Sequence, residues 1–157
     1  MTDKHETALR AALAEMIGQR CERIDNPYGS VIRLDIGPLA LRPDDASTAT
    51  PHGWRHLTVL SPWRIASEAE VIADWNVDGG KHGLLSEAIQ PLRGDVVAAA
   101  TTSAPTYDLT ISWTSGLVLS VFADCTDSRD DAWFILGTDG LELSATPVIK
   151  RLPDRPK

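Results

Sequence analysis

The stretch Tyr107-Asp-Leu-Thr-Ile-Ser-Trp-Thr-Ser-Gly-Leu-Val-Leu-Ser-Val-Phe122 decides the fold class of this chain. Its apolar residues Leu109, Ile111 and Trp113 alternate with polar ones, as in a strand with one buried face. Ser115-Gly116 then supplies a tight turn, and a second strand of apolar and β-branched residues runs to Phe122. The stretch therefore predicts an antiparallel hairpin that packs one face against a core.

The first half of the chain repeats this pattern. Residues 30–36 alternate in the same way, with Ile32, Leu34 and Ile36 on the apolar face. Other positions recur at matching spacing: Leu9, Leu13 and Gly18 correspond to Leu85, Ile89 and Gly94, and Trp63-Arg64-Ile65 recurs as Trp133-Phe134-Ile135. Repeated apolar positions record how a unit packs, so we interpret the chain as an internal duplication. Specific chemistry is then expected where the two copies differ.

The predicted fold class is α+β, with two tandem helix-plus-antiparallel-β repeats packed with pseudo-twofold symmetry into one domain. The domain spans residues 1–157, with repeat units at about 7–75 and about 83–145 and a tail at 147–157. Helical spacing predicts a helix over 7–17 and a second over 84–92. Residues 43–53 and 124–131 are predicted loops, inserted where the two copies diverge.

The amino-acid composition argues against some classes of function and favours others. The 157 residues carry a formal charge of -7, with 22 acidic residues against 15 basic ones. Nucleic-acid binding depends on clustered Lys and Arg, so this charge argues against it and favours a basic protein partner. The sequence has no apolar leader and no run of about 20 apolar residues, so we expect a cytoplasmic protein that does not cross a membrane. We expect a monomer or a homodimer.

A resemblance supports this interpretation. Met16-Ile17-Gly18-Gln19-Arg20, followed by residues 32–37 and by Leu57-Thr-Val-Leu-Ser-Pro-Trp-Arg-Ile65, is similar to a pattern found in small uncharacterised bacterial proteins. Those proteins have a "Leu-Ile-Gly-Lys" helix end, an alternating strand and a "Pro-Trp-Arg-Ile" close. Some of them resemble immunity proteins of toxin systems. The resemblance implies a fold unit and a basic toxin domain as one kind of partner, but no catalytic chemistry.

The motif search predicts no catalytic residue, no cofactor and no metal site. No Gly-x-Ser-x-Gly, Ser-x-x-Lys or paired Cys and His motif is present. Gly79-Gly80-Lys81 lacks the other residues of a phosphate-binding loop. His52 and His56 have the spacing of a metal-binding pair, but Pro51 and Gly53 break this segment, so we expect surface or loop histidines without defined geometry.

The sequence thus favours a non-enzymatic protein-binding module that uses an acidic surface. Four residues combine aromatic and guanidinium groups, and four carboxylates form an acidic loop. These candidate contact residues are Trp54, Arg55, Arg64, Trp75, Asp124, Asp127, Asp130 and Asp131. The alternative is a small-ligand-binding or enzymatic domain with its site in a cleft between the two repeats. A filled apolar junction would favour the binding module, and a polar pocket there would favour the alternative.

Overall fold

The computed structural model describes residues 4–41, 51–76, 84–123 and 131–148. Its helices are α1 (Lys4–Met16), α2 (Leu85–Ala88) and the 3-10 helix η1 (Gln90–Leu92). The strands are β1 (Cys21–Asp25), β2 (Ile32–Ala40), β3 (His52–Val59), β4 (Trp63–Ala66), β5 (Val71–Asp74), β6 (Val97–Thr102), β7 (Leu109–Trp113), β8 (Val118–Val121), β9 (Trp133–Gly137) and β10 (Glu142–Ala145).

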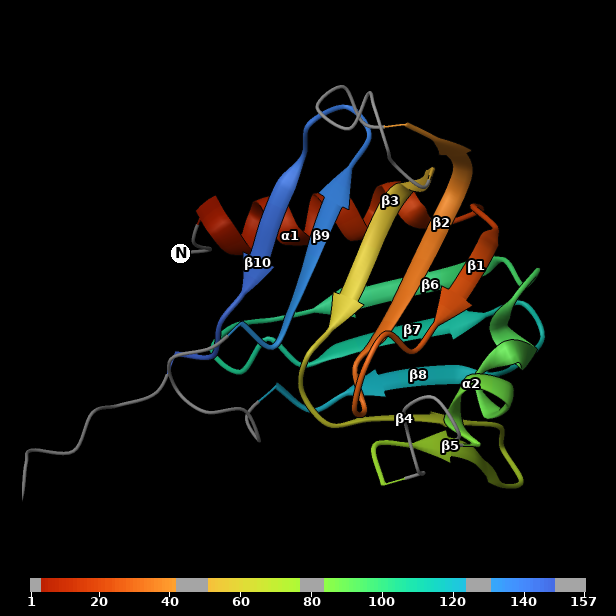
Figure 1. The fold of residues 1–157 in the computed structure, drawn as a ribbon. Coiled ribbons are helices and arrows are strands. Elements are labelled where there is room, and N and C mark those ends of the chain that lie inside the picture. The colour runs from red at the N-terminus through yellow and green to blue at the C-terminus, as the bar shows by residue number, and fades with distance from the viewer. Residues whose placement is uncertain (1–3, 42–50, 77–83, 124–130, 149–157) are drawn as a thin grey trace, which may run out of the picture.

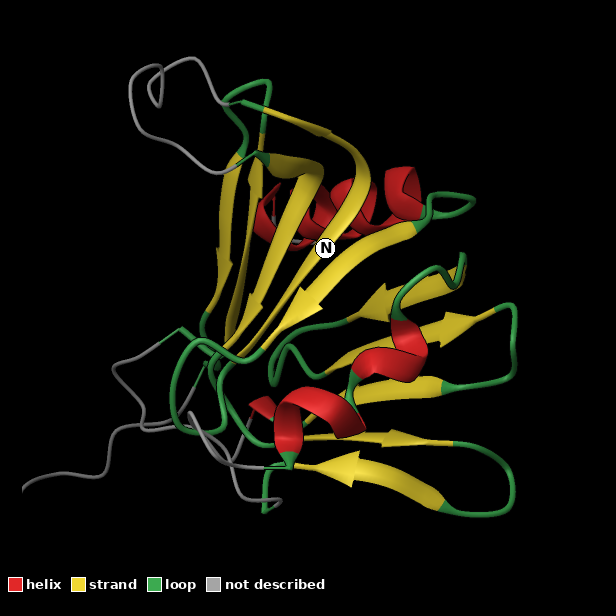
Figure 2. Cartoon of the chain, turned by 45° about the vertical axis from the view of Figure 1, so that its right-hand side comes forward, coloured by secondary structure: helices red, strands yellow, loops and turns green. Residues whose placement is uncertain are grey.

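The ten strands form two five-stranded antiparallel sheets (Figure 1). Sheet 1 has the order β1-β2-β3-β9-β10, and sheet 2 has the order β5-β4-β8-β7-β6. The strands of one sheet run steeply across those of the other, as in crossed sheet packing (Figure 1). Figure 2 shows the two sheets from another side, with α1 beside them; α1 contacts β6 of sheet 2 and β10 of sheet 1, while α2 contacts β5 and η1 contacts β1.

The predicted α+β class with tandem helix-plus-β repeats is wrong. The structure is mostly β, with one 13-residue helix and a second α-helix of only four residues. The halves are also not separate units, because β4 pairs with β8 and β3 pairs with β9. Each sheet therefore takes three strands from one half of the chain and two from the other. Local hydrophobic patterns predict strands but do not reveal which distant strand each one pairs with.

The predicted hairpin at 107–122 is confirmed, and it shows why these residues form strands. β7 and β8 pair in register, and Trp113 N closes the turn between them by donating to the Leu117 carbonyl at 2.9 Å. Leu109, Ile111 and Leu119 are fully buried on the inner face, while Thr110 on the outer face is exposed. The alternation read from the sequence therefore matches the inside and outside of this sheet.

The two helical segments differ in length for local reasons. α1 buries Leu9, Leu13 and Met16 against β6 and β10, and the chain turns after it at Gly18, whose φ of +85° favours glycine. The predicted second helix over 84–92 is much shorter, because α2 ends at Ala88 and Pro91 lies in η1. Proline lacks the backbone N–H of an α-helix, and its ring clashes with the preceding turn. None of the helices in the described ranges is long and apolar enough to cross a membrane.

A continuous core joins the inner faces of both sheets. Trp63 and Trp133, which are at most 1% exposed, anchor it from opposite sheets. The Nε1 of Trp63 donates to the Ser30 carbonyl at 2.7 Å, and the Nε1 of Trp133 donates to the Tyr107 carbonyl at 2.8 Å. Each bond ties a strand from one sheet to the start of a strand in the other.

Edge strands β1 and β6 protect each other along one side of the molecule. Gly18 N donates to the Val97 carbonyl and Gly94 N donates to the Cys21 carbonyl, both at 2.8 Å. An isolated bridge between Arg20 and Val96 lies between these bonds. Pairing of this kind removes the unpaired backbone groups that make exposed sheet edges prone to aggregation.

Candidate functional site

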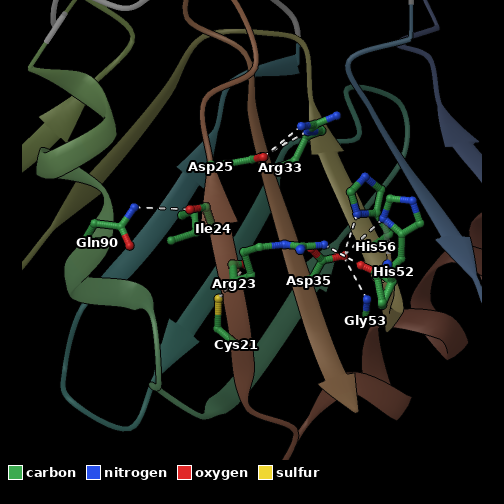
Figure 3. Close-up of polar contacts among 11 residues, drawn as sticks. Cys21, Arg23, Ile24, Asp25, Arg33, Asp35, His52, Gly53, His56 and Gln90 are labelled. Carbon is green, nitrogen blue, oxygen red and sulfur yellow. Dashed lines mark hydrogen bonds and ion pairs between the residues drawn. The ribbon is translucent and has the colours of Figure 1, made fainter. Parts of the chain in front are cut away.

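The outer face of sheet 1 carries a polar cluster at the centre of the sheet. Asp35 of β2 and His56 of β3 lie directly opposite each other in the antiparallel register. His56 Nδ1 donates to Asp35 Oδ1 at 2.8 Å (Figure 3). Both residues are buried, with exposed fractions of 3% and 8%, although they point away from the apolar core. The sheet therefore holds a fixed carboxylate and imidazole pair on its outer face.

Two further donors hold the Asp35 carboxylate in place. Gly53 N donates to Oδ1 at 2.8 Å, and Arg23 Nε donates to Oδ2 at 2.8 Å. Arg23 is itself held, because its Nη2 donates to the Pro51 carbonyl at 2.5 Å. Only glycine fits at position 53, since a Cβ there would lie 2.5 Å from the backbone nitrogen of Ile36. Strands β1, β2 and β3 thus all contribute to the position of this carboxylate.

The Asp35 carboxylate is ionised at neutral pH. Burial by itself raises the pKa of Asp35, but hydrogen bonds from His56 and Gly53 and the charge of His56 outweigh it and lower the pKa to about 2. The Arg23 hydrogen bond acts in the same direction. The carboxylate of Asp35 is therefore ionised beside His56, and Arg23 is its paired cation.

His52 completes the cluster at the start of β3. Its Nδ1 lies 3.7 Å from Asp35 Oδ1, and its ring centroid lies 4.8 Å from that of His56 at an interplanar angle of 62°. The two imidazoles border a small pocket of about 70 Å³, which Gly53, Leu136, Gly137 and Thr138 also line. We call Asp35, His52 and His56 the Asp-His-His cluster.

The expectation that His52 and His56 are loop histidines without defined geometry is therefore wrong. Both lie in β3, which begins at His52, and not in a loop that extends to residue 53. The pairing of β2 with β3 shifts its register between Ile36 and Leu39, and the strand continues beyond this irregularity to pair Ala40 with His52. Gly and Pro in the sequence suggest that a strand ends there, but a strand pair with a bulge tolerates both residues.

Two of the predicted contact residues, Trp54 and Arg55, are neighbours in β3 and contact each other. Arg55 is 3% exposed, and its guanidinium donates to Asp139 at 2.9 Å and to Glu15 of α1 at 3.1 Å. Its central carbon also lies 3.8 Å from the centroid of the half-buried Trp54 ring. The pairing with Arg55 lowers the pKa of Asp139. Arg55 links β3 to α1 and to the turn between β9 and β10, so it offers no free guanidinium to a partner.

The other two, Arg64 and Trp75, share one groove on sheet 2. The groove has a volume of about 330 Å³ and is lined by Pro62, Trp63, Arg64, Asp74, Trp75, Asn76 and Phe122. Arg64 is exposed, and its guanidinium carbon lies 5.3 Å from the Phe122 ring centroid. We call this feature the Arg64–Trp75 groove.

The predicted acidic loop falls mostly outside the described residues. Asp124, Asp127 and Asp130 lie in that undescribed segment. Asp131 is half-buried and accepts a hydrogen bond from Thr146 Oγ1 at 2.7 Å. Asp131, the first described residue after this segment, therefore has a hydrogen-bond partner within the fold.

Sequence reasoning missed Asp35 and Arg23 altogether. A usable signal lies in the comparison of two strand pairs that share the same apolar pattern, because residues that differ between them are not required by the pairing itself. In sheet 2, Ser112 pairs with Val118 and Thr110 pairs with Ser120. In sheet 1, Asp35 pairs with His56 and Arg33 pairs with Thr58 at corresponding places beside the shared apolar residues. Uncharged residues thus stand in the sheet 2 pair at places where the sheet 1 pair has Arg33, Asp35 and His56.

No protein-family model, curated protein or solved structure matches this chain. Function must therefore be argued from the two sites themselves. The similarity to small uncharacterised bacterial proteins and to immunity proteins stays a prediction from the sequence.

Proposed function

We propose that this protein is a non-enzymatic protein-binding module of the bacterial cytoplasm, and that its contact surface includes the Arg64–Trp75 groove. One observation carries the proposal: two residues singled out from the sequence as partner contacts line the same groove. Arginine and tryptophan are among the residues most enriched in the energetic centres of protein interfaces. Phe122 adds a second aromatic ring beside the Arg64 guanidinium.

Hydrogen bonds hold the walls of the groove in place, which favours binding because less freedom is lost on association. Trp75 N donates to the Trp63 carbonyl at 3.0 Å, and Ser30 Oγ donates to the Trp75 carbonyl at 2.7 Å. Asp74 Oδ1 accepts a hydrogen bond from Asn76 N at 2.9 Å. A partner side chain would therefore enter a site that is already formed.

The alternative of a ligand-binding or enzymatic cleft was predicted between two repeats, which are not separate units because each sheet contains strands of both halves. An interior cleft would instead have to open at the junction between the two sheets. The inner faces that meet there contribute fully buried apolar side chains, among them Leu34, Ile65, Ile111 and Ile135. A catalytic cleft requires polar groups that converge on an open volume. Packed apolar side chains fill this junction in the described parts of the chain.

We further propose that the partner is basic, as the toxin domain implied by the resemblance would be. The formal charge of -7 favours a basic surface over nucleic acid. In this proposal Asp124, Asp127 and Asp130 add negative charge to the contact, and the protein acts as a monomer or a homodimer. Charge of this kind chiefly speeds association and selects the partner, while the buried aromatic contacts supply affinity.

The test combines capture with direct binding. The tagged full-length chain is used to capture proteins from a lysate of its own organism, and a captured protein is purified. Its affinity is then measured by calorimetry for the wild type, Arg64→Ala, Trp75→Ala and the control Arg10→Ala, which removes an exposed guanidinium from α1. We expect about 10-fold or greater weakening for the two groove variants, no change for the control, and weaker binding at higher salt.

Two outcomes would contradict the proposal. One is that no captured protein binds the purified chain directly. The other is that a partner binds both groove variants as tightly as the wild type. Arg64 is exposed, so its variant keeps the test informative if Trp75→Ala is less stable.

A further inference from the structure

The Asp-His-His cluster is not needed to form the strand pairing in which it lies. Sheet 2 makes the matching pair of strands with Ser112 opposite Val118, where sheet 1 has Asp35 opposite His56. The flanking apolar pairs are alike, with Leu34 opposite Leu57 and Ile111 opposite Leu119. A small polar residue and a valine therefore suffice for this architecture. The buried carboxylate and imidazoles call for another explanation.

The cluster has the donor atoms of a metal site. Asp35, His52 and His56 each offer one ligand atom, and these atoms all lie within 4.8 Å of one another. Two imidazole nitrogens and one carboxylate oxygen form a donor set that suits Zn²⁺ and related divalent ions. Ligands at about 2.0–2.2 Å from such an ion lie roughly 3.4 Å apart, so a small inward movement of His52 completes the site. The 2.8 Å and 3.7 Å separations from Asp35 Oδ1 already bracket this spacing.

We propose that Asp35, His52 and His56 bind a divalent transition-metal ion of the Zn²⁺ class. The pocket of about 70 Å³ beside the two imidazoles has room for water to fill the remaining coordination positions. This site lies on the outer face of sheet 1, away from the Arg64–Trp75 groove, and does not depend on the function proposed above.

The surrounding residues prepare the carboxylate for this role. Arg23 Nε occupies Oδ2, so Oδ1 is the atom that faces both histidines. Gly53 N fixes the same carboxylate from the backbone. Hydrogen bonds of this kind orient ligands and typically change metal affinity by about 10- to 100-fold when they are removed. The positive charge of Arg23 opposes a cation, but it is already paired with Asp35.

The proton balance of binding is simple. In the metal-free protein His56 Nδ1 carries the proton that is donated to Asp35 Oδ1. On binding, this proton leaves Nδ1 for solvent or for an unprotonated Nε2, and the Nδ1 lone pair turns to the metal. The ion then replaces the hydrogen bond as the link between imidazole and carboxylate. No oxidant or further reactant takes part.

The experiment titrates Zn²⁺ into the chelator-treated full chain and follows binding by calorimetry, with Co²⁺ absorption as a second readout of the ligand set. We expect one ion per chain for the wild type and at least about 10-fold weaker binding for His52→Ala and for His56→Gln. His5→Ala is the matched control, because it removes an imidazole from α1 on the other side of sheet 1. It should bind Zn²⁺ as the wild type does.

Circular dichroism and denaturant unfolding establish that each variant is folded. The His52 side chain is 29% exposed, so His52→Ala keeps the test decisive if His56→Gln is too unstable. The absence of saturable Zn²⁺ binding to the wild type would overturn the proposal and leave a polar network only. Binding that survives in both cluster variants would overturn it as well.

Discussion

At the scale of single residues, the two faces of sheet 1 shift the pKa values of their ionisable groups in opposite directions. Asp35 is ionised on the outer face, whereas Cys21 on the inner face is fully buried with its Sγ 3.5 Å from the Arg23 carbonyl. Burial raises the pKa of Cys21 to about 12, and the negative charge of Asp35 adds to the effect. Since the thiolate is the nucleophile, Cys21 is an inert core residue.

We expect Cys21 to react with thiol reagents only when the protein unfolds. In a Cys125→Ser variant, Cys21 is the remaining cysteine, so labelling with iodoacetamide reports on it alone. At pH 8 the folded protein should stay unlabelled, because the pH lies far below the pKa of about 12, and denaturant should restore rapid reaction. Mass spectrometry measures the labelled fraction. Fast labelling without denaturant would show that Cys21 is accessible and reactive in the native state.

At the scale of elements, sequence patterns predict strands better than they predict partners. The alternation in residues 30–36 and 107–122 identifies β2, β7 and β8, because each has one buried face. The start of β3 was missed because the pairing of His52 with Ala40 depends on a register shift in another strand. The exchange of β4–β5 and β9–β10 between the halves is equally non-local, so neither the crossed sheets nor the Asp-His-His cluster was predictable from spacing.

The indole N–H groups of Trp63 and Trp133 donate hydrogen bonds that join the sheets, whereas that of Trp113 does not. We therefore expect the first two N–H groups to contribute more to stability. In Trp133→Phe the buried Tyr107 carbonyl loses its donor, which costs about 1–3 kcal/mol beyond the lost packing. Trp113 is the matched control, because its buried Nε1 has no hydrogen-bond partner within the described residues. Denaturant unfolding followed by circular dichroism compares Trp133→Phe with Trp113→Phe. Equal losses of unfolding free energy would mean that the Trp133 hydrogen bond contributes nothing.

At the scale of the whole molecule, the exchange of strands makes the two halves depend on each other. β4 finds its sheet partner β8 in the second half, and β9 finds β3 in the first. The edges of β1 and β6 and the core tryptophans add further links between the halves. A half without the other would expose one face of each of its strands and leave its outermost pair of strands without a sheet. Two strands alone are marginally stable in water.

We therefore expect fragments 1–76 and 84–157, produced separately, to remain largely unfolded, and the intact chain to unfold in one cooperative step. Mixing the fragments should restore the β-sheet signal, because the missing strands and core residues are then supplied in trans. Far-UV circular dichroism and denaturant titration measure both results. A fragment that folds cooperatively by itself would show that the halves are independent units, and two separate unfolding transitions of the intact chain would lead to the same conclusion. Single-step unfolding would instead mean that a substitution in either sheet lowers the stability of both the Asp-His-His cluster and the Arg64–Trp75 groove, since both stand on the same core.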